Sequence, residues 1–363
     1  MATQITNYQC PACTGPLTFS SDIGKLKCDY CGMEYEVAYI EELYAKKEET
    51  AAAQGTDTAW DLSLAGGTWS DEEAANMRAY SCPSCGAQVI CDVTTAATSC
   101  PYCGNPTTVP GNFAGTLKPD YVIPFMLNKD HAKAALKNFY KGKKFLPNNY
   151  ASDNRIEEMK GMYVPFWLFS CKTDGDMVFN ATKENKYTSG KEEVTVTEHY
   201  RVDRSGNVWF EKVPVDGSVK MPDEHMEAIE PYDYSGLAAF SSAYLPGFLA
   251  DKYDISSDEC NKRANERIRV STEDALKSTV QGYDSVSTQT SNIRINKGDV
   301  KYAFFPVWML NTKWKDQDFL FAMNGQTGKL VGDLPVDKGK FWLWFVAIAA
   351  PIFVVLNILF FWI

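Results

Sequence analysis

The sequence is poor in the residues on which most enzyme chemistry depends. It holds three histidines among 363 residues, and none lies in a His-Glu-x-x-His motif or beside a nucleophile signature. No pair of carboxylates stands out by its spacing for general acid–base work. The segment NGQTGKLVG at 324–332 lacks the GxxxxGK[ST] spacing of a phosphate-binding loop and indicates a hairpin turn instead. We therefore expect a protein that is not an enzyme and has no small-molecule substrate. The histidines are His131, His199 and His225.

An excess of positive charge is also lacking, because the formal net charge is −10. Nucleic-acid binding depends on lysine and arginine displacing counterions from the phosphate backbone. Residues 1–42 carry only two lysines against six carboxylates, so the N-terminal segment does not supply a basic patch. Nucleic acid is therefore an unlikely partner from charge alone.

Cysteine is not scarce, and eight of the 11 cysteines form two sets with the same spacing. Each set has two Cys-x-x-Cys pairs separated by 14 residues, which fits a tetrahedral four-cysteine zinc site. Nothing at the N-terminus resembles a signal peptide, which disfavours disulfides, and redox dithiols do not normally occur in matched sets of four. The predicted ligands are Cys10, Cys13, Cys28 and Cys31 in one set and Cys82, Cys85, Cys100 and Cys103 in the other.

Both sites are expected to be structural zinc sites in zinc ribbons. Four thiolates close the coordination sphere, whereas catalytic zinc keeps one position open. A glycine follows each Cys-x-x-Cys pair directly or after one threonine, and it lets the backbone turn so that its N–H groups point at the sulfurs. Cys91, Cys171 and Cys260 are expected to pack as small apolar side chains.

Charge is absent from the last 23 residues, Phe341 to Ile363. About 20 helical residues span a hydrocarbon core of roughly 30 Å, so this segment predicts a transmembrane helix. Lys338 and Lys340 precede it, as the positive-inside rule expects of a cytoplasmic flank. No residues follow the helix. We therefore expect a single-pass, tail-anchored protein of the cell membrane, with its soluble part in the cytoplasm.

The fold class expected from these features is α+β and multidomain. It combines two tandem four-cysteine zinc ribbons, a β-rich body with a duplicated antiparallel unit, and a C-terminal transmembrane helix. The expected boundaries are zinc ribbon 1 at 1–42, a helical and flexible linker at 43–77, zinc ribbon 2 at 78–112, the α+β body at 113–336 and the membrane helix at 341–363.

The duplication is inferred from two similar segments, KGMYVPFWLF and YAFFPVWML, in which Pro165 and Trp167 match Pro306 and Trp308. Each copy continues through a polar turn into an apolar strand. Between the copies, helices are predicted at 236–250 and 256–269. Capping boxes are predicted at Ser70 with Glu73 and at Ser256 with Glu259.

A run of lysines follows the strand predicted at 121–125. The ordinary interpretation is a solvated helix face and turn, and contact with anionic lipid near the anchor is the alternative. The run comprises Lys129, Lys133, Lys137, Lys141, Lys143 and Lys144.

The ordered motifs SCPYCGNPTTVP, YVIPFML, KGMYVPFWLF, YLPGFLADKYD, FPVWML and FAMNGQTGKLVGDLP, followed by the apolar helix, suggest a family. The sequence resembles bacterial TFIIB-type zinc-ribbon membrane proteins. It is similar to the membrane zinc-ribbon proteins encoded with SPFH-domain and phage-shock PspA-type proteins. The resemblance implies a non-enzymatic scaffold that recruits such partners to the membrane under membrane stress. A membrane-tethered, nucleic-acid-binding regulator, suggested by the ribbon type, is the alternative.

Overall fold

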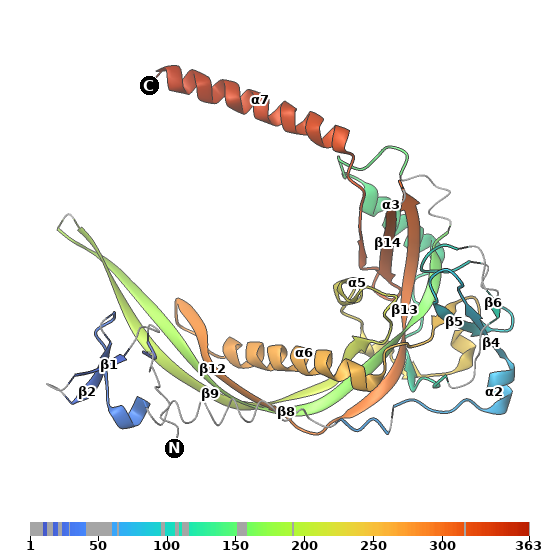
Figure 1. The fold of residues 1–363 in the computed structure, drawn as a ribbon, viewed down its shortest axis with the longest axis horizontal. Helices are drawn as coiled ribbons and strands as arrows, with labels where there is room; N and C mark the ends of the chain where they lie inside the picture. Colours follow the sequence, from blue (N-terminus) through green and yellow to red (C-terminus); the bar gives the residue numbers. More distant parts are fainter. Residues whose placement is uncertain are drawn as a thin grey trace. The chain divides into compact units, whose positions relative to one another are not determined.

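The computed structural model separates into two compact units, each built from distant parts of the chain (Figure 1). The first unit combines residues up to 61 with 169–213 and 261–299. The second combines 62–168, 214–260 and 300–363. The described residues are 10–12, 17–20, 24–28, 30–40, 60–63, 65–95, 99–105, 109–110, 116–150, 158–190, 192–315 and 317–362.

The N-terminal part of the first unit is a small antiparallel sheet of β1 (Leu17–Ser20), β2 (Lys25–Cys28) and β3 (Glu34–Tyr35). Leu17 pairs with Cys28 at one end of the β1–β2 hairpin, and Gly24 turns the chain with φ +67° at the other. Leu26 and Cys28 are buried, so alternate residues of β2 face the interior of this small module. We call residues 10–40 cysteine module 1.

The rest of the first unit is a long β ribbon covered by a helix. The hairpin of β8 (Lys160–Ser189) and β9 (Glu192–Asp216) is joined by β12 (Ser285–Ile295), which pairs antiparallel with β8. The helix α6 (Ser257–Ser278) runs beside this ribbon (Figure 1). Phe179, Val202 and Leu276 pack in one cluster between strands and helix. This apolar contact fixes the helix on the ribbon.

The second unit contains most strands of the large sheet, which has the order β10-β7-β13-β8-β11-β5-β4-β6. Outside this order, β14 pairs with β13 and with β15, β12 pairs with β8, and β9 pairs with β8. The remaining strands are β4 (Met77–Ser81), β5 (Gln88–Asp92), β6 (Val109–Pro110), β7 (Tyr121–Val122), β10 (Ala238–Ala239), β11 (Leu249–Asp251), β13 (Asp299–Trp314), β14 (Gln317–Asn324) and β15 (Leu330–Gly332).

The helices of the second unit are short except for the last one. They are α2 (Asp71–Ala75), α3 (Lys129–Tyr140), α5 (Asp223–Ala228) and α7 (Lys338–Trp362), with 3-10 turns at Tyr234–Gly236 and Ser242–Tyr244. Ala132 and Leu136 of α3 are fully buried, as its predicted apolar stripe requires. A β-rich body with one C-terminal apolar helix is therefore present.

The first copy of the similar segments forms the start of β8, and two contacts fix it. The carbonyl of Pro165 accepts a hydrogen bond from the Gly217 N–H at 2.8 Å, just after the end of β9. The Trp167 indole N–H donates to the Ile255 carbonyl at 2.9 Å, immediately before α6. Strand β11, which precedes that carbonyl, runs parallel to β8.

The second copy forms β13 and makes the same two kinds of contact. The Pro306 carbonyl accepts from the Gly325 N–H at 2.8 Å, just after the end of β14. The Trp308 indole donates to the Leu127 carbonyl at 2.9 Å, shortly before α3. Strand β7, which precedes that carbonyl, runs parallel to β13. The matched prolines and tryptophans therefore occupy equivalent places in two strand pairs.

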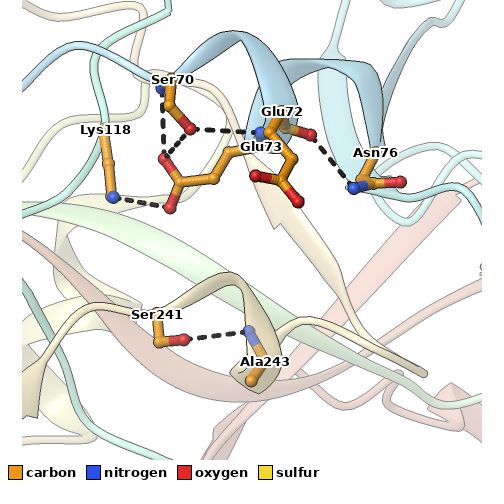
Figure 2. A network of polar contacts seen from close by, with 7 residues as sticks. All are labelled: Ser70, Glu72, Glu73, Asn76, Lys118, Ser241 and Ala243. Carbon is orange, nitrogen blue, oxygen red and sulfur yellow. Dashed lines mark hydrogen bonds and ion pairs between the residues drawn. The ribbon is translucent and has the colours of Figure 1, made fainter.

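The predicted capping boxes are confirmed. Figure 2 shows the Ser70 hydroxyl accepting from the Glu73 N–H at 3.2 Å while the Glu73 carboxylate accepts from the Ser70 N–H at 3.2 Å. Lys118 binds the other oxygen of that carboxylate at 2.7 Å. Ser256 and Glu259 form the same reciprocal pair before α6. Each box satisfies N–H groups that a helix end leaves without an internal acceptor.

One helix prediction is wrong. No helix covers 236–250, where two 3-10 turns alternate with the short strands β10 and β11. Pro246 lacks the N–H that a helix needs, and Gly247 has φ +83°, which ends any helical run. The prediction at 256–269 is correct in type, but α6 continues to Ser278.

The turn predicted at 324–332 is confirmed. The Asn324 side-chain oxygen accepts from the N–H groups of Gln326 and Thr327 at 2.9 and 3.0 Å. An asparagine that holds its own turn in this way is a common hairpin device. The turn connects β14 to β15.

Candidate metal centres

The second cysteine set forms a four-sulfur cluster in the second unit. Cys82 and Cys103 have their Sγ atoms 3.6 Å apart, and Cys85 and Cys100 also lie at 3.6 Å. All four sulfurs lie within 4.8 Å of one another and could hold a metal ion. A disulfide would need about 2.0 Å between sulfurs, so these cysteines are not disulfide-bonded. The predicted ligand set of the second site is therefore brought together as a whole.

The backbone around these cysteines repeats one turn. The N–H of Cys82 donates to the Ala87 carbonyl at 2.8 Å, and the Gly86 N–H donates back to the Cys82 carbonyl at 2.9 Å. The Cys100 turn is closed in the same way, and Gly86 and Gly104 have φ near +74° and +70°. Only glycine adopts that conformation without strain. The prediction that glycine shapes these turns is confirmed.

The turns direct N–H groups toward the sulfurs. Burial raises the pKa of the Cys82 thiol, but hydrogen bonds from the Cys85 and Ser84 N–H groups and from the Cys103 and Cys85 thiols together lower that pKa to about 7. Burial raises the pKa of Cys85 and of Cys100. Thiolates are the form that binds metal. The loop geometry therefore favours the ligand form at this cysteine.

The body of the second unit holds this cluster from several sides. Strand β5, which follows the first turn, pairs with β11. Lys160 donates to the Ser99 carbonyl at 2.6 Å, and Lys220 donates to the Cys85 carbonyl at 2.8 Å. The Asn311 amide donates to the Tyr102 carbonyl. We call residues 77–110 cysteine module 2, and it is built into the body's sheet.

The two lysines also bear on the charge of the cluster. Four thiolates around a divalent ion leave a net charge of −2 in a site whose Cys82 and Cys100 are nearly fully buried. Burial lowers the pKa of Lys160, and the charge of Cys100 raises it. Two ammonium groups at the turns therefore offset a charge that would otherwise be costly to bury.

A buried carboxyl lies behind module 2. Asp251 on β11 is 2% exposed. Burial raises its pKa to about 7, against the lowering effect of the neighbouring Ser218 and Tyr102 side chains. It lines neither of two surface cavities found among the described residues, one of which includes His199 and Arg201 and the other Glu266 and Glu273. Asp251 is thus placed as a packing neighbour of the second cysteine turn.

Three cysteines of the first set, Cys10, Cys28 and Cys31, are brought together in module 1. The Sγ atoms of Cys10 and Cys31 are 3.6 Å apart, and Cys28 joins them in a group that could hold a metal ion. The Cys28 turn is closed by the same two hydrogen bonds as in module 2, with Gly32 at φ +73°. Cys13 lies outside the described residues.

The remaining cysteines pack in the interior, as predicted. Cys91 is fully buried and donates to the Thr95 carbonyl at 3.1 Å. Cys171 is buried, and Cys260 lies against the Asp216 carbonyl at 3.6 Å. Burial raises the pKa of Cys91 and of Cys171 to about 11, which keeps both as thiols. Neither of the two metal-binding groups of described residues includes them.

The three histidines lie on different elements. His131 is on α3, His199 on β9 and His225 on α5. Among the described residues, none of the three belongs to a group that could hold a metal ion.

The C-terminal helix α7 is long and apolar enough to span a membrane over Lys338–Asn357, and none of that stretch is buried. The Asn357 amide donates to the Phe353 carbonyl at 2.8 Å, so this polar group is partly satisfied within the helix. Such internal bonding is what a lipid environment requires.

The functional residues missed by sequence reasoning are the ones that support module 2. Lys160, Lys220 and Asn311 lie far from the cysteines in sequence, and each contacts a turn carbonyl. The sequence around each of these residues does not predict a contact with the cysteine turns, because only the folded sheet brings them there.

Comparison with known proteins gives one informative match. No family model matches the chain, and no solved structure matches it. The chain is 35% identical over 355 residues to the uncharacterized protein YdjG of Bacillus subtilis (strain 168). The match covers 98% of this chain and 97% of that protein, so it is not confined to the cysteine motifs.

The two cysteine clusters should differ in what their loss does. Replacing Cys82 and Cys85 by serine removes ligands from the core of the second unit, whereas Cys28→Ser with Cys31→Ser affects the small sheet of module 1. We expect each double variant to lose one metal ion per chain by elemental analysis. Only the first should show a large drop in the unfolding temperature of the body. Equal drops for both variants would contradict the difference between the modules.

The lysines at the turns give a second prediction. Lys160→Met with Lys220→Met should raise the rate of metal loss to a chelator by about 10- to 100-fold, because both support the cluster without binding the ion. Lys277→Met, at an exposed position of α6, is the control. A release rate unchanged from that of the control would show that the lysines do not stabilise the cluster.

The raised pKa of Asp251 predicts a pH dependence of stability. The unfolded carboxyl ionises near its model value of 3.8, while the folded one stays protonated up to about 7. Folding therefore takes up a proton between these values, and the stability contribution present at low pH is lost as pH rises. Between about pH 4 and about pH 7, the unfolding temperature of the wild type should fall relative to that of Asp251→Asn. Above about pH 7 the difference between the two unfolding temperatures should stay constant. The matched control is Asp130→Asn, which changes an exposed carboxylate in the same way.

Proposed function

The chain belongs to the family of the Bacillus subtilis protein YdjG, and we propose that it is a non-enzymatic zinc protein anchored in the cell membrane that recruits partner proteins there. The observation that carries the proposal is that one unit contains both the candidate metal site and the candidate membrane helix. The second unit holds the four-cysteine cluster in its sheet and also bears the exposed apolar helix α7.

Zinc is the ion that the cluster favours. Four sulfurs around Zn²⁺ at about 2.3 Å lie roughly 3.8 Å apart in a tetrahedron, close to the separations of 3.6 Å. Soft thiolates in this geometry select zinc or iron–sulfur centres over hard cations. A zinc ion closed in by four thiolates has no position for water or substrate, so its role is structural. Both modules are on this proposal zinc ribbons.

The anchor is α7, crossing the membrane once. Its N-terminal flank carries Lys338 and Lys340, which favours a cytoplasmic location for the body by the positive-inside rule. Eight zinc thiolates also require a reducing compartment. The zinc modules then face the cytosol at the inner surface of the cell membrane.

Module 1 offers the docking surface. Beside its Cys31 turn, Tyr30 is 80% exposed and Met33 is 45% exposed. Aromatic and methionine side chains exposed on a rigid turn are typical of protein contacts, where such residues carry much of the binding energy. From the motif resemblance we propose SPFH-domain and PspA-type proteins as the partner classes, in a membrane-stress assembly.

The nucleic-acid-binding alternative has less support. Of the two lysines in module 1, Lys25 is paired with Glu36 at 2.9 Å. The nucleic-acid-binding alternative predicts that the full-length protein binds DNA or RNA in gel shifts at low salt, and that this binding weakens as salt is added.

In-cell crosslinking of the full-length protein, followed by mass spectrometry, tests the scaffold proposal. A deletion of residues 1–110 would remove β4 and β5 from the sheet, so a point variant is the sharper tool. We expect Tyr30→Ser with Met33→Ser to lower the capture of SPFH-domain or PspA-type partners at least tenfold, as loss of a contact residue worth about 2 kcal/mol predicts.

Tyr187→Ser with Met126→Ser changes the same residue types at other exposed positions and should leave the capture unchanged. Equal capture by both variants would rule out this surface. Capture of nucleic-acid-associated proteins alone, or of nothing, would overturn the scaffold proposal.

A further inference from the structure

A loop rich in lysine lies directly against the start of α7. The loop follows α3, and its Phe145 carbonyl accepts from the Asp337 N–H at 2.8 Å. The Lys340 ammonium donates to the Leu146 carbonyl and to the Asn148 side chain, both at 2.6 Å. The segment 141–148 is therefore tied to the first turn of the helix by three hydrogen bonds.

Aromatic contacts extend this junction along α7. The Phe145 and Phe341 rings lie 5.8 Å apart, and both side chains are exposed. The Lys144 ammonium sits 4.1 Å from the centre of the Trp344 ring, a cation–π contact. Trp344 is six residues into the helix, about 9 Å from its start. An ammonium group is thus held beside the apolar part of α7.

The junction concentrates positive charge. Lys141, Lys143 and Lys144 are exposed on the loop, and Lys338 is exposed on the first turn of α7. The nearest carboxylate in sequence is Asp337, whose oxygen is engaged in capping the Gly339 and Lys340 N–H groups at 2.9 and 3.1 Å. No acidic residue occurs in 131–151, although the whole chain has a net charge of −10. The junction therefore has a local excess of positive charge in a protein that is acidic as a whole.

We propose that this junction, formed by the exposed Lys141, Lys143 and Lys338 together with Lys144 on the Trp344 ring, is a binding site for the headgroups of anionic phospholipids. The proposal rests on α7 being a membrane anchor, as proposed above. It also assigns different roles to the lysines of the run. Lys133 lies within 3.8 Å of Asp130 at the start of α3, whereas Lys144 at the end of the run contacts Trp344 of α7.

The depth of the site favours lipid over a soluble anion. The polar headgroup regions occupy roughly 5–8 Å on each side of the hydrocarbon core. Trp344 lies about 9 Å into α7, so an indole in its usual interfacial position places the Lys144 ammonium at headgroup depth. The long lysine stems can lie along apolar surface while the charges reach phosphate groups. Each such lysine strengthens binding by about fivefold.

Native mass spectrometry of the full-length protein in non-ionic detergent tests the proposal. Dioleoyl phosphatidylglycerol and dioleoyl phosphatidylcholine are titrated separately onto the wild type and onto Lys141→Gln, Lys143→Gln, Lys144→Gln. We expect the wild type to bind phosphatidylglycerol at least tenfold more tightly than phosphatidylcholine. The triple variant should lose this preference and bind phosphatidylcholine unchanged.

The matched control is Lys183→Gln, Lys186→Gln, Lys277→Gln, which removes the same charge at exposed positions elsewhere. This control variant should keep the preference for phosphatidylglycerol. Loss of the preference in the control variant as well would show a general effect of charge and would overturn the proposed site. Glycerol 3-phosphate in excess should not displace the lipid, because displacement would indicate a soluble anion site instead. A wild type without preference would also overturn the proposal.

Alkaline carbonate extraction of cell membranes separates this proposal from the proposed function. If the wild type is extracted as a soluble protein, the anchor itself fails and the lipid site fails with it. If all three proteins stay in the membrane and none prefers phosphatidylglycerol, only the lipid site is wrong. A metal content equal to that of the wild type confirms that each variant is folded.

Discussion

The gathering of four cysteine sulfurs at the core of the second unit, where Cys82 and Cys100 are buried and Cys85 and Cys103 are partly exposed, is the constraint on which that unit depends. Cys82 and Cys100 belong to the same apolar cluster as Met162 and Phe166 of β8. Their sulfurs, held 3.6 Å apart in pairs, make no disulfide and lie too close together to be left as buried thiolates without a cation. A metal ion bound by these sulfurs would therefore be coupled to the folding of the body. Module 1 has its own three-stranded sheet, and its Tyr39 hydroxyl accepts a hydrogen bond from Arg201 of β9. The first module can serve as a displayed surface, and the second is a structural part of the body.

The body itself is organised by one contact pattern used twice. In each strand pair a proline carbonyl binds a glycine N–H beyond the returning strand, and an indole binds a carbonyl before a helix. The proline lacks an N–H of its own, so it interrupts the ladder on one side while its carbonyl still holds the chain on the other. The buried indole N–H needs an acceptor, and the carbonyl supplies it. The two parallel contacts, β11 with β8 and β7 with β13, place both helices after equivalent strands.

The features that sequence predicted depend on local spacing. Cys-x-x-Cys turns, the Ser70 and Ser256 capping boxes and the turn at Asn324 each arise from residues within a few positions of one another, and the apolar helix arises from one continuous run of the sequence. The features that it missed depend on tertiary pairing. Asn311 reaches Tyr102 and Lys160 reaches Ser99 only because the sheet brings distant strands together. The mistaken helix at 236–250 shows the same limit, because its apolar residues suit short strands beside β7 and β5 as well as a helix, and Pro246 with Gly247 decides between them.

The junction at α7 has a mechanical consequence for the second unit. A helix joined to a domain by a flexible linker leaves that domain free to rotate above the bilayer. Here the Asp337 N–H and the Lys340 ammonium bind the loop after α3, and Phe145 packs on Phe341, so the first turn of α7 is continuous with the body. Leu136 anchors α3 in turn in the core that contains Trp308 and Phe321. With α7 in a membrane, the bilayer would therefore hold the second unit, including its cysteine cluster, in one orientation. A fixed orientation lowers the entropy that a partner at the same membrane would lose on docking.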